Sequence, residues 1–203
     1  MIPDLARERE LWVQGYRRVA GVDEVGRGPL AGPVCVAAVI FAPGAALPFG
    51  IQDSKKLDRA RREALAPLIM ETALAVSVVF VCAREIDRLN IRGATLAAMS
   101  RALSSLALRP DFALIDGRDS PEAACPTRAV IGGDARSLSI AAASIVAKVA
   151  RDNMMRCADA HFPGYGFSSH AGYGTLEHRK ALTRLGPSPL HRLSFKTSSV
   201  EGC

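Results

Sequence analysis

Short apolar runs alternate with amphipathic stretches along this chain, and the alternation predicts strands interleaved with helices. Apolar runs bounded by glycine, proline or charged residues are typical of buried strands. We expect such strands at 18–23, 34–41, 75–81, 112–116 and 128–131. Apolar residues at helical spacing predict helices at 57–70, 84–90, 94–108, 137–160 and 174–185. The fold class predicted is therefore α/β, with a mixed central β-sheet flanked by helices.

The helix expected at 137–160 is apolar on nearly all faces in its first half and rich in alanine. This composition predicts a buried helix that approaches its neighbours closely. Asp53 or Ser54 is expected to cap the helix at 57–70. Clusters of glycine and proline predict loops within a single domain covering residues 1–203, of which about 160–203 is a loop-rich and helical C-terminal extension.

Composition narrows the class of protein. The 203 residues are 49% hydrophobic and 23% charged, which is ordinary for a globular domain. No apolar run reaches the ~20 residues needed to span a bilayer, and charged residues at 7–10 interrupt any export signal. We therefore expect a soluble, cytoplasmic protein. The net charge of +6 is compatible with a polyanionic partner but favours nucleic acid only weakly.

The five cysteines are scattered and form no CxxC pair, which argues against a disulfide framework and a zinc ribbon. Cys35 and Cys82 lie in apolar runs and are expected to be small core residues. The four histidines, all in the C-terminal quarter, have no zinc-site spacing and are expected to face phosphates or to be structural.

Four acids are placed alike, each beside glycine at the end of an apolar strand. Asp23 and Glu24 end the first strand, Asp116 ends another, and Asp134 follows the last. In open α/β sheets a site forms at the strand ends, so these acids could converge. Carboxylates suit Mg²⁺ or Mn²⁺, and two such ions about 3.5–4 Å apart would clamp the attacking and leaving oxygens of a phosphodiester.

Two points stay open for these acids. Neighbouring side chains on a regular strand point to opposite faces, so Asp23 and Glu24 share a site only if the chain bends; Gly26 and Gly28 are expected to allow a bulge. Asp116 could also be a simple Asp-Gly turn residue, and Asp134 a helix cap.

The segment Gly26-Arg27-Gly28 precedes a strand rather than a helix, and its next glycine is misplaced for a dinucleotide fingerprint. Glycines on both sides of an arginine let the backbone approach a ligand closely while the guanidinium meets a phosphate. The alternative is a tight hairpin turn with a solvated arginine.

Five blocks of the chain together resemble the ribonuclease HII family, in the family's order. The blocks are 21–34, 53–57, 114–117, 133–152 and 172–175. The resemblance implies a ribonuclease H-like fold and an endonuclease that cuts the RNA strand of RNA/DNA hybrids and 5′ of single ribonucleotides in duplex DNA. Hydrolysis by two metal ions, Mn²⁺ or Mg²⁺, would leave 3′-hydroxyl and 5′-phosphate ends.

The resemblance also implies roles for particular residues. The metal-binding catalytic acids would be Asp23, Glu24, Asp116 and Asp134. The 2′-hydroxyl would be read by Gly26, Arg27 and Gly28. Tyr173 would stack on the deoxyribose 3′ of the ribonucleotide, with Tyr165 as the competing candidate. Phosphates would be contacted by Lys55, Lys56 and Lys148, although Lys148 could instead extend to water.

One position departs from the family pattern, in which lysine often lies two places before the acid matching Asp134. This chain has Gly132 there, which leaves open the electrostatics at that end of the site. Two other functions remain: another metal-dependent nuclease of the same fold, and a non-catalytic hybrid-binding module. A monomer is expected, because a nuclease needs an open groove.

Overall fold

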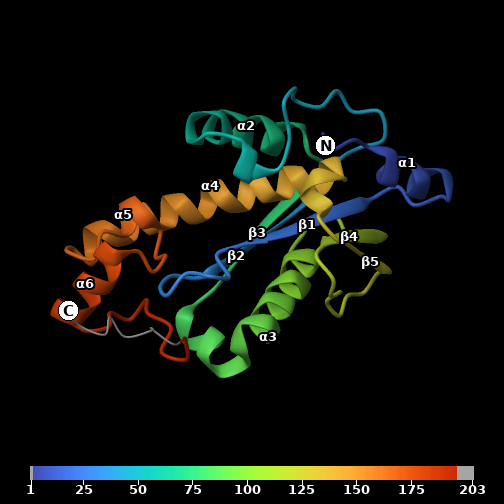
Figure 1. Cartoon of the computed structure of the whole chain (residues 1–203). Helices are drawn as coiled ribbons and strands as arrows, with labels where there is room; N and C mark the ends of the chain where they lie inside the picture. Colours follow the sequence, from blue (N-terminus) through green and yellow to red (C-terminus); the bar gives the residue numbers. More distant parts are fainter. Residues whose placement is uncertain (1, 196–203) are drawn as a thin grey trace.

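Five strands form one mixed sheet in the order β3-β2-β1-β4-β5 (Figure 1). They are β1 (Val19–Val25), β2 (Val34–Ile40), β3 (Ala75–Val81), β4 (Phe112–Asp116) and β5 (Thr127–Val130). In this computed structural model, which describes residues 2–195, β1-β2 and β2-β3 are antiparallel, whereas β1-β4 and β4-β5 are parallel. The predicted mixed sheet is confirmed, and every strand agrees with its expected range to within two residues.

Six α-helices and two 3₁₀ turns are described. They are α1 (Ala6–Val13), η1 (Ser54–Lys56), α2 (Arg59–Thr72), α3 (Ala83–Ser104), η2 (Gly133–Ala135), α4 (Leu138–His161), α5 (Phe167–His170) and α6 (Leu176–Leu185). The sequence pattern did not predict α1 or α5. The two helices expected at 84–90 and 94–108 form the single element α3, which is broken at Asn90, where φ is 57° and ψ is 168°.

The helix caps differ in part from the sequence prediction. Asp58, not Asp53 or Ser54, caps α2 by accepting a hydrogen bond from the Arg61 N–H at 2.7 Å. Asp53 instead caps η1, because a separate 3₁₀ turn precedes α2. The N-cap of α4 is Ser137. Asp134 lies before it in η2 and is therefore not the cap of α4, which leaves its carboxylate available.

Helices cover both faces of the sheet (Figure 1). The face of β1 that carries Ala20 and Val22 packs on α3, and the other face packs on α4, with α2 beyond. Gly21 lets α4 come close, because a Cβ at this position would lie 2.2 Å from the Ser139 carbonyl carbon. The predicted close approach of the alanine-rich helix is therefore confirmed.

The second half of α4 runs past the sheet and packs against α5 and α6 (Figure 1). The chain then returns to the β1-β2 turn, where the Arg192 N–H donates to the Leu30 carbonyl at 2.9 Å. The C-terminal elements thus lie against the glycine-rich turn beside the acids. Residues 196–203, which include Cys203 and the end of the expected extension, lie outside the described residues, and the single-domain division stays a prediction.

Two cysteine expectations have different outcomes. Cys35 is buried in β2, and burial raises the pKa of its thiol to about 12. Cys82 was expected in the core but is exposed, because β3 ends at Val81 and Cys82 is the residue that leads into α3. Among the described helices, none has the length and apolar character that crossing a membrane requires.

Candidate active site

Asp23 and Glu24 both lie in the regular part of β1, where each pairs with a residue of β2. The bulge expected after this pair is absent from the described strand, because Val25 still pairs with β2 and the left-handed residue that follows the pair is Gly26, with φ of 92°. Asp23 therefore faces the α4 side of the sheet and Glu24 the α3 side. Glu24 lines a small pocket together with residues of α3 and with Asp116, whose charge acts on it.

A short hydrogen bond joins Asp116, at the end of β4, to Gly133, the residue before Asp134 in η2. Asp116 ends β4 two residues after Leu114, which packs with Ile140 of α4, so the Asp116 side chain lies on the α4 face. Its Oδ1 accepts a hydrogen bond from the Gly133 N–H at 2.6 Å. Asp134 follows in η2 and is 7% exposed. Asp23, Asp116 and Asp134 thus lie on the same side of the sheet.

The carboxylates repel one another in a poorly solvated place. Burial raises the pKa of Asp23 well above its usual range, and the charges of Glu24 and Asp116 raise it further. Burial also raises the pKa of Glu24, although Arg27 opposes this shift. The pKa of Asp116 is raised by burial first and then by Asp134. A cation bound here would offset both the burial and the repulsion.

Lys55 supplies the one ammonium that contacts these acids in the described residues. Its Nζ lies 3.3 Å from Asp134 Oδ2. Partial burial works against the charge of Lys55, but Asp134 outweighs it, so the pKa of Lys55 is raised. Gly132, the position where the family often has lysine, adopts left-handed backbone with φ of 62°, a conformation that favours glycine. A positive charge therefore reaches Asp134 from η1 rather than from position 132.

The other basic residues predicted to contact substrate have different surroundings. Arg27 is half exposed, and its Nη1 lies 3.4 Å from Glu24 Oε1. Lys56 is exposed on η1. Lys148 Nζ lies 2.7 Å from Asp152 Oδ1 on the next turn of α4, so its charge is already compensated. Of these three, Arg27 is the one in contact with a catalytic candidate.

Two buried arginines that sequence reasoning missed hold the glycine-rich turn in place. Arg151 of α4 donates to the carbonyls of Pro33, Ala171 and Ala31 at 2.9, 3.0 and 3.2 Å. Arg192 donates to the carbonyls of Gly26, Arg27 and Gly32 at 2.6, 2.9 and 2.8 Å. Arginine is normally a surface residue, so the local pattern carried no signal for these roles. The conformation of the glycine-rich turn is consequently stabilised by buried hydrogen bonds from these two guanidinium groups.

Tyr173 and Tyr165, the two competing tyrosines, occupy different environments. Tyr173 is 46% exposed, and its Cε1 lies 3.8 Å from the position a Cβ on Gly28 would take. Tyr165 is buried, its ring stacks on Phe167 with centroids 5.2 Å apart, and its hydroxyl donates to the Gly186 carbonyl at 2.7 Å. Only Tyr173 is therefore presented beside the turn.

Three histidines form a buried stack that supports the backbone around Tyr173. The rings of His170 and His178 stack at 4.4 Å, and His178 Nε2 lies 3.0 Å from His191 Nε2. We assign the His178 Nδ1–H as donor to the Tyr173 carbonyl at 2.9 Å, so its Nε2 accepts from the His191 Nε2–H. The His191 Nδ1 then accepts the Ser188 N–H. For these three rings a structural role is found.

This network predicts lower stability in acid. Burial lowers the pKa of His178, and burial together with His178 lowers the pKa of His191 to about 4. Below about pH 6.5 these histidines are protonated in the unfolded chain but stay neutral in the folded chain. The free energy of unfolding therefore decreases as the pH is lowered. We expect the free energy of unfolding to drop by about 1 kcal/mol between about pH 6.5 and pH 5 through this network, after discounting for solvent screening.

The measurement is urea unfolding across this pH range with and without the network. His191→Gln should flatten the dependence, whereas His161→Gln, at an exposed ring, should leave it unchanged. Equal slopes for the wild type and His191→Gln would show that burial does not lower the pKa of His191 in the folded protein.

Carboxylate oxygens suit hard cations such as Mg²⁺ and Mn²⁺, although the side chains of the four acids do not come together in a single metal-binding group. Within residues 2–195, no three histidine, cysteine or acidic side chains lie close enough together to hold a metal ion. Asp23, Glu24 and Asp116 nevertheless have raised pKa values, a cost of burial and repulsion that a divalent cation relieves. Acidic residues at the strand ends, beside an anchored glycine-arginine turn, are compatible with the class of metal-dependent nucleases.

Comparison with known proteins narrows the class to one family. The family described as ribonuclease HII matches residues 20–198. Ribonuclease HII of Moorella thermoacetica is 56% identical over 191 residues, covering 94% of this chain and 92% of that protein. The chain belongs to the ribonuclease HII family. It is an endonuclease of the ribonuclease H type, a metal-dependent hydrolase that acts on RNA/DNA hybrids.

Solved structures agree on the fold. The ribonuclease H2 of Pyrococcus horikoshii has a TM-score of 0.74 at 24% identity, covering 88% of this chain and 94% of that one. Bst-RNase HIII, solved in complex with Mn²⁺, has a TM-score of 0.67 at 22% identity, covering 89% and 67%. The predicted ribonuclease H-like fold is therefore confirmed.

Proposed function

We propose that Asp23, Glu24, Asp116 and Asp134 are the catalytic carboxylates of this nuclease and hold two divalent ions, Mg²⁺ or Mn²⁺. The observation that carries the proposal is the placement of the buried Asp23 and Asp134 and the half-buried Asp116 on one side of the sheet, with Glu24 at the same end of β1. The Mn²⁺ complex of the structurally similar Bst-RNase HIII supports the metal assignment.

Bound metal would supply Lewis acidity toward the scissile phosphate and a nucleophilic water. The chain's own residues would bind and orient. The three aspartates would hold cations from the α4 face, while Glu24 would approach from the α3 side. Lys55 would orient Asp134 through the 3.3 Å ion pair, and Arg27 would hold Glu24 in the same way. Cleavage would fall 5′ of the ribonucleotide and leave 3′-hydroxyl and 5′-phosphate ends.

The turn at Gly26, Arg27 and Gly28 is proposed to recognise the 2′-hydroxyl through backbone N–H groups. The Gly26 and Arg27 carbonyls already accept hydrogen bonds from Arg192. In the described part of the chain, the N–H groups of Arg27 and Gly28 donate to no protein acceptor. These N–H groups are therefore the ones aimed at a ligand oxygen, which only RNA provides at this position.

The experiment compares matched duplexes that differ by one ribonucleotide. The wild type should cut the duplex with the single ribonucleotide in Mg²⁺ or Mn²⁺, spare its all-DNA counterpart, and lose activity in EDTA. Cutting of both duplexes would favour a less selective nuclease of the same fold. Binding without cutting in either metal would favour the non-catalytic hybrid-binding module.

Tyr173 is proposed to test for the deoxyribose on the 3′ side of the ribonucleotide. Tyr173→Ala removes an exposed ring, so it should leave the melting temperature within about 1–2 °C while reducing cleavage at a single ribonucleotide about tenfold or more. Tyr165→Phe, a matched control in the core, should cut normally and lose some stability with its hydrogen bond to Gly186.

Comparing cleavage of a continuous RNA/DNA hybrid with cleavage at a single ribonucleotide tests whether Tyr173 senses the RNA-to-DNA junction. The Tyr173→Ala defect should be largest where RNA meets DNA, and an equal loss on both substrates would argue against junction sensing. Phosphate contacts by Lys55, Lys56 and Lys148 stay predictions. The monomeric state and the cytoplasmic location also stay predictions.

A further inference from the structure

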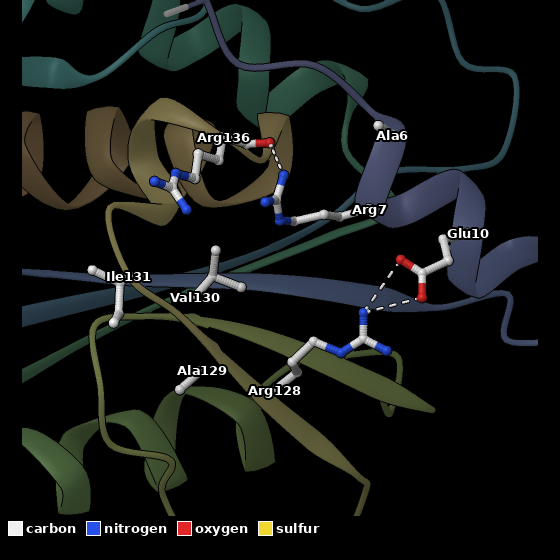
Figure 2. Close-up of a pocket in the computed structure, with 8 residues that line it drawn as sticks. All are labelled: Ala6, Arg7, Glu10, Arg128, Ala129, Val130, Ile131 and Arg136. Carbon is white, nitrogen blue, oxygen red and sulfur yellow. Dashed lines mark hydrogen bonds and ion pairs between the residues drawn. The ribbon is translucent and has the colours of Figure 1, made fainter.

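A groove of about 590 Å³ lies outside the carboxylate site, along the free edge of the sheet (Figure 2). Arg7 and Glu10 enter it from α1, Arg128 comes from β5, and Arg136 comes from the segment between η2 and α4. Its floor is the edge strand β5 and Ile131, which is 61% exposed. The groove is therefore wide, shallow and rimmed by guanidinium groups.

The charges of this groove are not balanced by its own residues. Three arginines face one acid, Glu10, which leaves two positive charges uncompensated in the lining. Glu10 pairs with Arg128 at 3.3 Å. Arg7 Nη1 donates to the Arg136 carbonyl at 2.9 Å. The Arg136 guanidinium is exposed and, among the described residues, donates to no protein acceptor, so its fork is available to a ligand.

The groove lies next to the end of β4 that carries Asp116, although none of the four acids lines it. Val130, in its floor, pairs directly with Asp116 across the β4-β5 ladder, and strands in such a ladder lie about 4.8 Å apart. Val130 also packs with Ile140 of α4, so the groove opens on the face that carries the aspartates. Arg136 follows Asp134 by two positions. A polyanion bound at the aspartates could run into the groove without crossing the sheet.

We propose that this groove binds the sugar-phosphate backbone of the substrate duplex, away from the scissile phosphate. The inference rests on the proposed function, since it adds a second binding surface for the duplex that is cut at the carboxylates. Guanidinium groups match phosphate oxygens in geometry, and an open groove with an excess of positive charge suits contact that is independent of base sequence. Arg136 provides the principal phosphate contact, and Arg128 and Arg7 add to the positive electrostatic potential of the groove.

The test compares Arg136→Gln with Arg109→Gln, an exposed arginine just before β4 at the opposite end of that strand from Asp116. Steady-state cleavage is measured on single-ribonucleotide duplexes whose flanks are shortened stepwise on either side. For Arg136→Gln we expect KM on the long duplex to rise about five- to tenfold with kcat nearly unchanged. The salt dependence of kcat/KM should weaken by about one unit of log–log slope.

The series of shortened duplexes tests whether Arg136 contacts the duplex away from the cleavage site. The Arg136→Gln defect should vanish once one particular flank is too short to reach the groove, and Arg109→Gln should match the wild type throughout. A defect that persists on the shortest duplex, or appears in kcat, would mean that Arg136 acts on Asp134 and would overturn the proposal. The same conclusion follows if Arg136→Gln and Arg109→Gln behave alike.

A second variant adds charge without removing an arginine. Ile131→Glu places a carboxylate in the groove and should raise KM on long duplexes only, whereas Leu108→Glu, partly exposed at the far end of the strands, should not. A normal KM for Ile131→Glu would overturn the proposal and leave a small anion or an added peptide strand as the occupant. If the wild type cut no ribonucleotide-containing duplex, the proposed function itself would fail, whatever the groove variants did.

Discussion

Asp23→Asn is expected to eliminate cleavage, a loss of at least about 10³-fold, while hybrid binding stays within several-fold of the wild type. Asp23 is 5% exposed and lies on the face that also carries Asp116 and Asp134. An amide of the same shape cannot supply the negative charge that holds a divalent ion. The substrate, by contrast, is held mainly by positive charges and the turn, which the substitution leaves in place.

The same variant should not be less stable without metal. Burial raises the pKa of Asp23, so its ionised form is destabilising in the folded protein at neutral pH, and asparagine removes that charge. In EDTA, the melting temperature of Asp23→Asn should equal or exceed that of the wild type. Inactivity together with normal or raised stability is the signature of a catalytic role rather than a folding defect.

Asp119→Asn is the matched control, because Asp119 borders the same pocket as Glu24 but is partly exposed and paired with Arg92 at 2.8 Å. It should retain activity within a few-fold. Cleavage by Asp23→Asn near the wild-type rate, measured in both Mg²⁺ and Mn²⁺, would rule out the metal-binding role of Asp23.

Arg192→Met should have the largest effect on stability together with an effect on selectivity. The Arg192 side chain is buried and donates to the carbonyls of Gly26, Arg27 and Gly32. Methionine fills part of the volume but leaves these acceptors without a donor, at a cost of about 3 kcal/mol or more. For a chain of this length, the melting temperature should fall by about 6–12 °C.

Activity is then measured well below the new melting temperature. Because the turn loses the guanidinium that shapes it, discrimination between the ribonucleotide duplex and its all-DNA counterpart should decrease. Arg192→Lys, which keeps one cationic donor, should recover part of the stability, and Arg84→Met on the exposed start of α3 should change neither property. Unchanged selectivity in folded Arg192→Met would show that the turn keeps its shape without this anchor.

Local sequence patterns were sufficient for much of the fold. The strands at 75–81 and 112–116 were predicted to the residue, because alternating or continuous apolar runs depend only on neighbours a few positions away. Helix α1 was missed, since it depends on distant contacts. Its Glu8 Oε1 accepts hydrogen bonds from Ser137 Oγ at 2.6 Å and from the Ser139 N–H at 3.0 Å, which lie about 130 positions along the chain.

The candidate site divides in the same way. The positions of Asp116 and Asp134 after apolar strands were visible locally, and so was the glycine-arginine turn. The contact of Lys55 with Asp134 spans 79 positions and no pattern indicated it. The choice between Tyr173 and Tyr165 likewise required their burial, because both lie in the same glycine-rich segment.

By itself, the sequence determined which acids, glycines and bases this protein has at its strand ends, and the order of elements that carries them. Those features follow from side-chain chemistry and from periodicity within a few residues. Only the tertiary structure decided that Asp23 and Glu24 face opposite sides of a regular strand, and that two buried arginines hold the turn. The reason is physical: burial, repulsion between carboxylates and contacts across a hundred residues arise only when the elements pack together.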